Sequence, residues 1–228
     1  MDLNNPIGIK SLEPNQQPFI MNPSRFASSG GPWFSEDFGS PSDNTWTQTS
    51  TGVSITGGEA VQAAASGTDR RIASAAKVGS ALSDTLWYAS FNAEFNTFNS
   101  SCTAMVIAVS DSDVNPRNTA SGSMLGMGVT GGSNIGFNCA AKNSGTPNQS
   151  ARINTGINTG MLASFFARES STTVRSKVSG FSDGTLTVDA GITDLQYVQV
   201  SNDADNPAAR FAYANTDELR IYDNEAIP

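Results

Sequence analysis

The sequence predicts an all-β protein, an antiparallel β-sandwich preceded by an extended N-terminal arm. Segments that alternate between apolar and polar residues recur along the chain, and each alternation of this kind gives a strand one apolar face. Turn signals separate these segments about every 8 to 12 residues, as in sandwiches. Charged residues make up only 15% of the 228 residues, whereas surface helices are usually rich in Lys, Glu and Arg.

The N-terminal 32 residues form a separate, Pro-rich segment. Prolines 6, 14, 18, 23 and 32 disfavour both helices and central strands here. A purely disordered tail would carry fewer apolar residues, so we expect an extended arm that binds a partner surface. An untethered terminus is the alternative. The residues that would make the contacts are Leu3, Ile7, Ile9, Leu12, Phe19, Ile20 and Phe26.

Residues 33–228 are expected to form the sandwich domain, which is long enough to bury its own core. Its first part, up to residue 74, is expected to hold short strands. Val53 and Ile55 alternate with polar residues, and Gly57 and Gly58 provide a turn before the chain returns. A further short strand is expected around Ile72.

Two central strands are predicted at residues 86–95 and 103–109. The first alternates, with Trp87, Phe91 and their neighbours on a buried face and Tyr88, Ser90 and Asn92 on a solvated face. The second is almost wholly apolar, which is typical of a strand covered on both sides.

The rest of the chain adds further strands, for a total of roughly a dozen. We expect a hairpin across the turn at 130–133 and a polar connection at 143–160. The remaining strands are predicted at 124–129, 135–140, 161–168, 172–178, in TLTVDAG, in LQYVQVSN, and at 219–222.

Charge and composition exclude several classes of function. The formal net charge is −8, which argues against binding to a nucleic-acid backbone or to anionic lipid. The chain has no histidine, which removes the common zinc sites and the histidine-based triads. No segment has the length of a membrane span, and the N-terminus does not have the pattern of a signal peptide.

Two further features leave alternatives open. Cys102 and Cys139 both lie in or beside predicted strands, and they could form a disulfide, although two buried free thiols are favoured. Two loops are rich in oxygen ligands that calcium prefers, and their candidate ligands are Asp111, Asp113, Asp203 and Asp205. The same residues are ordinary turn formers, which is the favoured interpretation, and no other cofactor is predicted.

Several motifs resemble a known group of sandwiches. These are Phe34, Asp37 and Phe38 in the opening segment, the following Trp46, a Gly-Gly pair before the next strand, and the closing segment DELRIYD. Together they resemble the concanavalin A-like lectin/glucanase jelly roll. Within that group, GSALSDTLWYASF and the later AVSDS are similar to laminin-G-like domains of phage and archaeal structural or surface proteins. The resemblance covers about residues 33–224 and implies a jelly-roll fold.

The resemblance does not extend to a catalytic site. Glucanases of this group carry E-x-D-x-E or E-x-D-x-x-E on one strand, because glycoside hydrolysis needs two carboxylates. None of the glutamates matches that pattern, so we expect no catalytic residues and no enzyme activity; they are Glu13, Glu36, Glu59, Glu94, Glu169, Glu218 and Glu225.

Two functions remain as the main hypotheses, and a glycan-cleaving enzyme with an unusual site is the third. The first is a virion structural accessory protein, a capsid decoration (cement) protein or an appendage subunit, whose arm docks on neighbouring subunits; the resemblance implies a homo-oligomer such as a trimer. The alternative is a lectin-like module, on a cell surface or a phage fibre, that binds a surface glycan. In one form of this hypothesis, glycan binding depends on calcium. Its candidate aromatic contacts are Trp33, Trp46, Tyr88, Tyr213 and Tyr222. Either hypothesis implies a virion or extracellular surface location.

Overall fold

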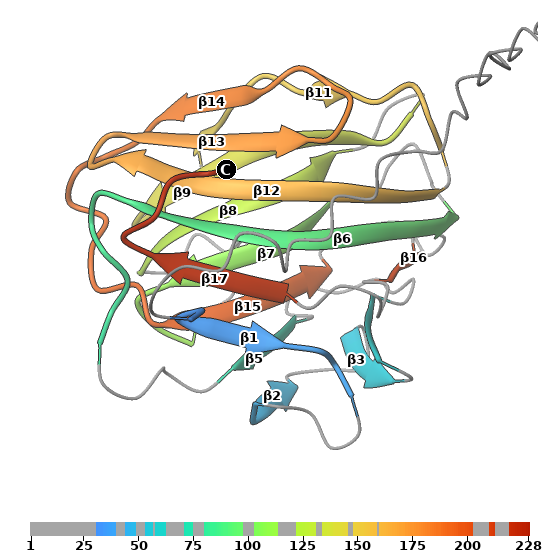
Figure 1. Cartoon of the computed structure of the whole chain (residues 1–228), viewed down its shortest axis with the longest axis horizontal. Coiled ribbons are helices and arrows are strands. Elements are labelled where there is room, and N and C mark those ends of the chain that lie inside the picture. The colour runs from blue at the N-terminus through green and yellow to red at the C-terminus, as the bar shows by residue number, and fades with distance from the viewer. Residues whose placement is uncertain are drawn as a thin grey trace, which may run out of the picture.

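A computed structural model describes 13 stretches of the chain. These are residues 31–39, 44–48, 53–56, 58–62, 71–74, 80–97, 103–113, 122–130, 134–145, 148–158, 160–202, 210–212 and 219–228. Their regular elements are all β-strands, and every strand pair is antiparallel. The strands form two sheets that lie one over the other (Figure 1). The predicted all-β, antiparallel sandwich is confirmed.

One sheet has nine strands, seven of them in the order β14-β13-β12-β6-β16-β4-β3, while β17 pairs with β6 and β1 pairs with β17. Its long central strands are β6 and β12, and its short strands lie toward the edges, where unpaired backbone groups would invite aggregation. The strands are β1 (Phe34–Glu36), β3 (Val53–Thr56), β4 (Glu59–Gln62), β6 (Trp87–Thr97), β12 (Gly160–Ser170), β13 (Thr173–Val178), β14 (Gly184–Thr187), β16 (Arg210–Ala212) and β17 (Leu219–Asp223).

The other sheet has eight strands in the order β10-β9-β8-β7-β15-β5-β2, with β11 also paired to β9. The hairpin predicted across residues 130–133 is confirmed as β8 and β9. The strands are β2 (Trp46–Gln48), β5 (Arg71–Ser74), β7 (Thr103–Ser110), β8 (Ser123–Thr130), β9 (Gly136–Asn143), β10 (Asn148–Gln149), β11 (Ile153–Asn154) and β15 (Tyr197–Asn202).

The main core lies between the two sheets. Trp87 of β6 is fully buried and packs edge-to-face on Phe166 of β12, with 5.6 Å between the ring centroids. From the opposite sheet, Ile107, Leu125 and Phe137 belong to the same apolar cluster. The apolar face predicted for the strand at Trp87 is therefore the core face, as period-2 alternation requires.

The opposite face of β6 is buried too, and the prediction that it is solvated is wrong. Tyr88, Ser90 and Asn92 are at most 7% exposed. Tyr88 stacks on Tyr222 of β17 at 4.9 Å, in a cluster with Phe165 to which Ile227 of the C-terminal tail is added. The alternation places side chains on two faces, but whether a face is wet depends on what later packs against it.

A buried arginine fixes the turn between β12 and β13. Arg168 is fully buried, and its guanidinium donates hydrogen bonds to the carbonyls of Ser170, Ser171 and Ile192 at 3.2, 2.9 and 2.6 Å. Burial lowers the pKa of Arg168, while the charge of Asp84 opposes that shift. These hydrogen bonds hold the β12–β13 turn against the segment that precedes β15.

The N-terminal arm and its boundary with the sandwich domain are predictions that the described residues do not test. Residues 1–30 of the predicted arm, with all seven of its candidate contact residues, lie outside the described residues. Its boundary with a domain at 33–228 therefore stays a prediction. In the part of the chain that is described, no helix could cross a membrane.

Candidate functional site

A cleft of about 510 Å³ opens where the edges of the two sheets meet. One wall is the segment 151–154, which contains β11. The other wall is the segment 180–185, which runs from the β13–β14 turn into β14. Figure 1 shows β11 and β14 side by side at one end of the sandwich.

Strand pairing and a tight turn place these two segments. Ile153 and Asn154 pair with Phe137 and Gly136 of β9, and Thr155 Oγ1 donates to the carbonyl of Ile135 at 2.7 Å. On the other wall, Gly180 has a φ of +85°, a conformation that side chains with a Cβ rarely adopt. The turn that it permits brings the chain back into β14.

The cleft combines one aromatic ring with several polar groups. Phe181 is half-buried and packs at the margin of the main core, so its ring forms an apolar wall. Asn154, Ser182 and Thr185 are exposed around it and offer amide and hydroxyl groups. The charged side chains of the lining are Arg152 and Asp183. This mixture suits a ligand that has both an apolar face and many hydroxyl groups.

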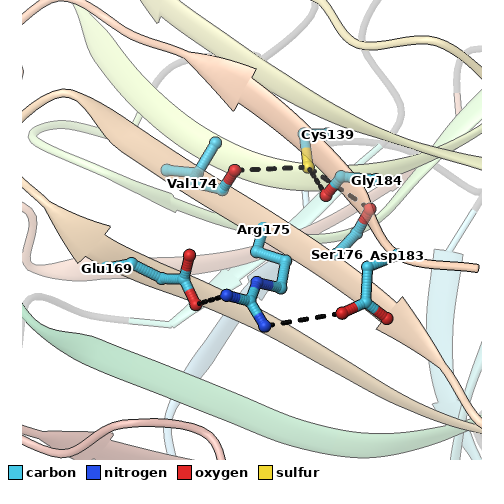
Figure 2. Close-up of polar contacts among 7 residues, drawn as sticks. All are labelled: Cys139, Glu169, Val174, Arg175, Ser176, Asp183 and Gly184. Atoms are coloured by element: carbon cyan, nitrogen blue, oxygen red, sulfur yellow. Dashed lines mark hydrogen bonds and ion pairs between the residues drawn. The ribbon is translucent and has the colours of Figure 1, made fainter.

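Close packing under Gly184 forms the floor of the cleft. A Cβ at Gly184 would meet Ile153 Cδ1 and Ser176 Oγ, both at 3.0 Å, so a larger residue would have to displace one of them. The thiol of Cys139 lies 3.2 Å from Ser176 Oγ and 3.3 Å from the carbonyl of Gly184 (Figure 2). Cys139 thus links β9 to the start of β14 across the sandwich.

Cys139 is a free, buried thiol. Desolvation raises the pKa of this thiol, and hydrogen bonds with Ser176 and Ser150 offset part of that shift. A protonated, buried thiol is a poor nucleophile, so it acts here as a packing group. Cys102, its candidate disulfide partner, lies outside the described residues.

An arginine bridges two carboxylates beside the cleft. Arg175 Nη2 lies 2.5 Å from Glu169 Oε1, and Arg175 Nη1 lies 3.4 Å from Asp183 Oδ2 (Figure 2). All three side chains are partly exposed, so these ion pairs add little stability. For the cleft, the consequence is that the carboxylate of Asp183 already has a cationic partner, Arg175.

The predicted metal ligands are not brought together in the described part of the chain. Asp111 uses its carboxylate locally, accepting hydrogen bonds from Ser123 N at 2.9 Å and Ser112 Oγ at 2.7 Å. Asp113 is exposed, and Asp203 and Asp205 lie outside the described residues. Among described residues, no group of three or more Asp, Glu, Cys or His side chains could hold a metal ion.

The predicted aromatic contacts do not line the cleft either. Tyr88 and Tyr222 are each 3% exposed, so neither offers a platform. Trp33 and Trp46 are half-buried and pack at the margin of the main core. Tyr213 lies outside the described residues.

No local pattern predicts the cleft, because its two walls are separated by more than twenty residues. Residues 151–154 lie in the predicted polar connection, and 180–184 lie between two predicted strands, at 172–178 and in TLTVDAG. They meet only because β11 pairs with β9 and β14 returns along β13. The one local signal was a Phe in a Gly-rich turn at 180–184.

Comparison with solved structures identifies the fold. The Bacillus licheniformis beta-glucanase superposes with a TM-score of 0.57 at 13% identity, covering 86% of this chain and all of that one. The GH43 protein BlXynB from the same organism gives 0.57 at 14% identity, over 83% of this chain and 39% of that one. The binding domain of botulinum neurotoxin DC, in complex with SialylT, gives 0.57 at 10% identity, over 87% and 49%.

These likenesses establish a β-sandwich jelly-roll fold, which is consistent with the concanavalin A-like jelly roll that the motifs resemble. The chain spans the full length of the beta-glucanase, but only about half of the toxin binding domain and less of the GH43 protein. No family model and no curated protein sequence matches the chain. At such low identities the likeness concerns the fold, and function has to be argued from the site.

Proposed function

We propose that this chain is a non-catalytic carbohydrate-binding module that holds a glycan in the cleft between residues 151–154 and 180–185. The observation that carries the proposal is the make-up of the cleft, in which the half-buried ring of Phe181 adjoins exposed amide and hydroxyl groups. A sugar ring has an apolar face of C–H groups that can pack on an aromatic ring. Its hydroxyl groups can then bond to Asn154, Ser182 and Thr185.

The acidic groups of the cleft favour binding over hydrolysis. Asp183 is the one carboxylate among the lining residues, and Arg175 pairs with it. A glycosidase of the usual kind needs two carboxyl groups across the scissile bond. The absence of the E-x-D-x-E pattern from the sequence supports the same conclusion.

The similar structures also favour this function over the virion hypothesis. They include a beta-glucanase, the binding domain of botulinum neurotoxin DC in complex with SialylT, and botulinum neurotoxin type C, whose cell entry depends on interaction with two ganglioside molecules. The toxin chains concerned are about twice as long as the part of them that this chain covers. The virion hypothesis depends on contacts between the arm and partner subunits. The candidate contact residues of the arm lie outside the described residues.

A glycan array tests the proposal directly. The wild-type protein should bind a defined set of glycans without releasing reducing sugar. Binding should persist in EDTA, because one carboxylate is too few to hold calcium in the cleft. N154A should weaken binding about fivefold, the effect of losing one hydrogen bond. N148A, which changes an exposed asparagine of β10 outside the cleft, is the matched control. An array with no bound glycan would contradict the proposal.

A further inference from the structure

The two charged side chains of the cleft, Asp183 and Arg152, differ in whether they have an ionic partner. Asp183 is paired with Arg175, which also pairs with Glu169 (Figure 2). Arg152, the other charged side chain of the lining, makes no ion pair within the described part of the chain. Arg175 shares its one positive charge between two carboxylates, so the charges of these three groups and Arg152 together sum to zero; the guanidinium of Arg152 itself, however, has no carboxylate partner among the described residues.

Arg152 also has hydrogen-bond donors to spare. Its Nη2 donates to the carbonyl of Asn134, which fixes the end of the side chain. Its Nε is buried and has no hydrogen-bond partner. A guanidinium carries further N–H groups on Nη1 and Nη2, and these remain for a ligand.

Gly136 makes this position of Arg152 possible. A Cβ built on Gly136 would collide with Nε and Cζ of Arg152, so the guanidinium lies directly against the glycine backbone. In the β9–β11 ladder, Gly136 pairs with Asn154, which also lines the cleft and lies two positions after Arg152. The arginine is thus held in the cleft by both a carbonyl and a close backbone contact.

We infer that the cleft selects glycans that carry a carboxylate, and that Arg152 binds that carboxylate. This inference rests on the carbohydrate-binding function proposed above. An arginine recognises a carboxylate through two parallel N–H···O bonds, and such charge-assisted bonds are stronger than those between neutral groups. The ring of a sugar acid, such as a uronic or sialic acid, would meanwhile occupy the apolar wall of Phe181.

The test compares glycans on one array that holds neutral, uronic-acid, sialic-acid and sulfated members. Calorimetry then follows on the best-bound acidic glycan and its carboxyl-reduced counterpart. The wild-type protein should bind the acidic member about tenfold more tightly. R152Q should abolish that difference, and R152K, which keeps the charge but loses the fork, should retain only part of it.

Arg220 of β17 supplies the control for overall charge, because R220Q removes an equal charge outside the cleft and should leave the preference intact. Equal binding of the acidic and carboxyl-reduced members would overturn this inference and leave the proposed function standing. So would equally tight binding of sulfated glycans, which would indicate a general anion site. Binding of no glycan at all would overturn the proposed function, and this inference with it.

Discussion

The carboxylate of Glu36 accepts a hydrogen bond from the indole Nε1 of Trp46 at 2.8 Å. The same fully buried carboxylate accepts from Phe38 N at 2.7 Å, and from both the backbone N and the side-chain Nδ2 of Asn44 at 3.1 and 2.9 Å. One side chain of β1 therefore binds Phe38, Asn44 and Trp46, and it holds Trp46 where its ring packs on that of Phe34, with 6.0 Å between the ring centroids. The aromatic opening motif of the sequence is arranged around an acidic residue.

Glu36→Gln should destabilise the fold by about 2 kcal/mol, because an amide NH₂ would replace one acceptor oxygen and face buried donors. Denaturant unfolding followed by tryptophan fluorescence measures the change. Glu169→Gln removes a carboxylate from a partly exposed ion pair and should cost less than about 1 kcal/mol. An E36Q variant as stable as E169Q would show that the buried hydrogen bonds do not organise this segment.

The thiol of Cys139 should be unreactive in the folded protein. Burial raises its pKa, and the reactive species is the thiolate. In a C102S background, a thiol reagent at neutral pH should modify Cys139 only after unfolding in urea. Rapid modification of the native protein would contradict the buried position that we describe under the cleft.

The Tyr88 hydroxyl should make stability depend on pH in the alkaline range. Desolvation, with smaller effects from Tyr222 and Glu225, raises its pKa from 10.0 to about 12. Between these values the unfolded chain has lost a proton that the folded chain keeps, so stability falls as the pH rises. Y88F should remove this part of the pH dependence of urea unfolding, whereas Y197F, which changes a tyrosine of β15 outside the cluster, should not. Equal slopes for Y88F and the wild type would contradict the assignment.

Local patterns predicted the long strands because alternation, or a short apolar run, is a property of each strand's own residues. The predicted segments at 86–95, 103–109 and 161–168 correspond to β6, β7 and β12, with ends that differ by a few residues. Burial of the second face was not predictable for Tyr88, since it depends on Tyr222 and Ile227 far along the chain. A local pattern carries no information about such distant partners.

The candidate site could not be predicted for a related reason. Arg152 and Phe181 have no shared motif. They line one cleft because β11 pairs with β9 and β14 pairs with β13, which brings the edges of the two sheets together. Gly136 and Gly184 carry part of the information, because each makes room for a side chain of the cleft, but a glycine in a strand sequence does not say which side chain it admits.

A titration of the ¹⁵N-labelled protein with its best-bound glycan, followed by amide chemical shifts, shows whether the glycan occupies the cleft. The account predicts that the largest shift changes fall on residues 151–154 and 180–185, with Gly136 also affected through Arg152. Unchanged shifts in both segments, with the changes gathered elsewhere on the sandwich, would show that the glycan binds outside the cleft.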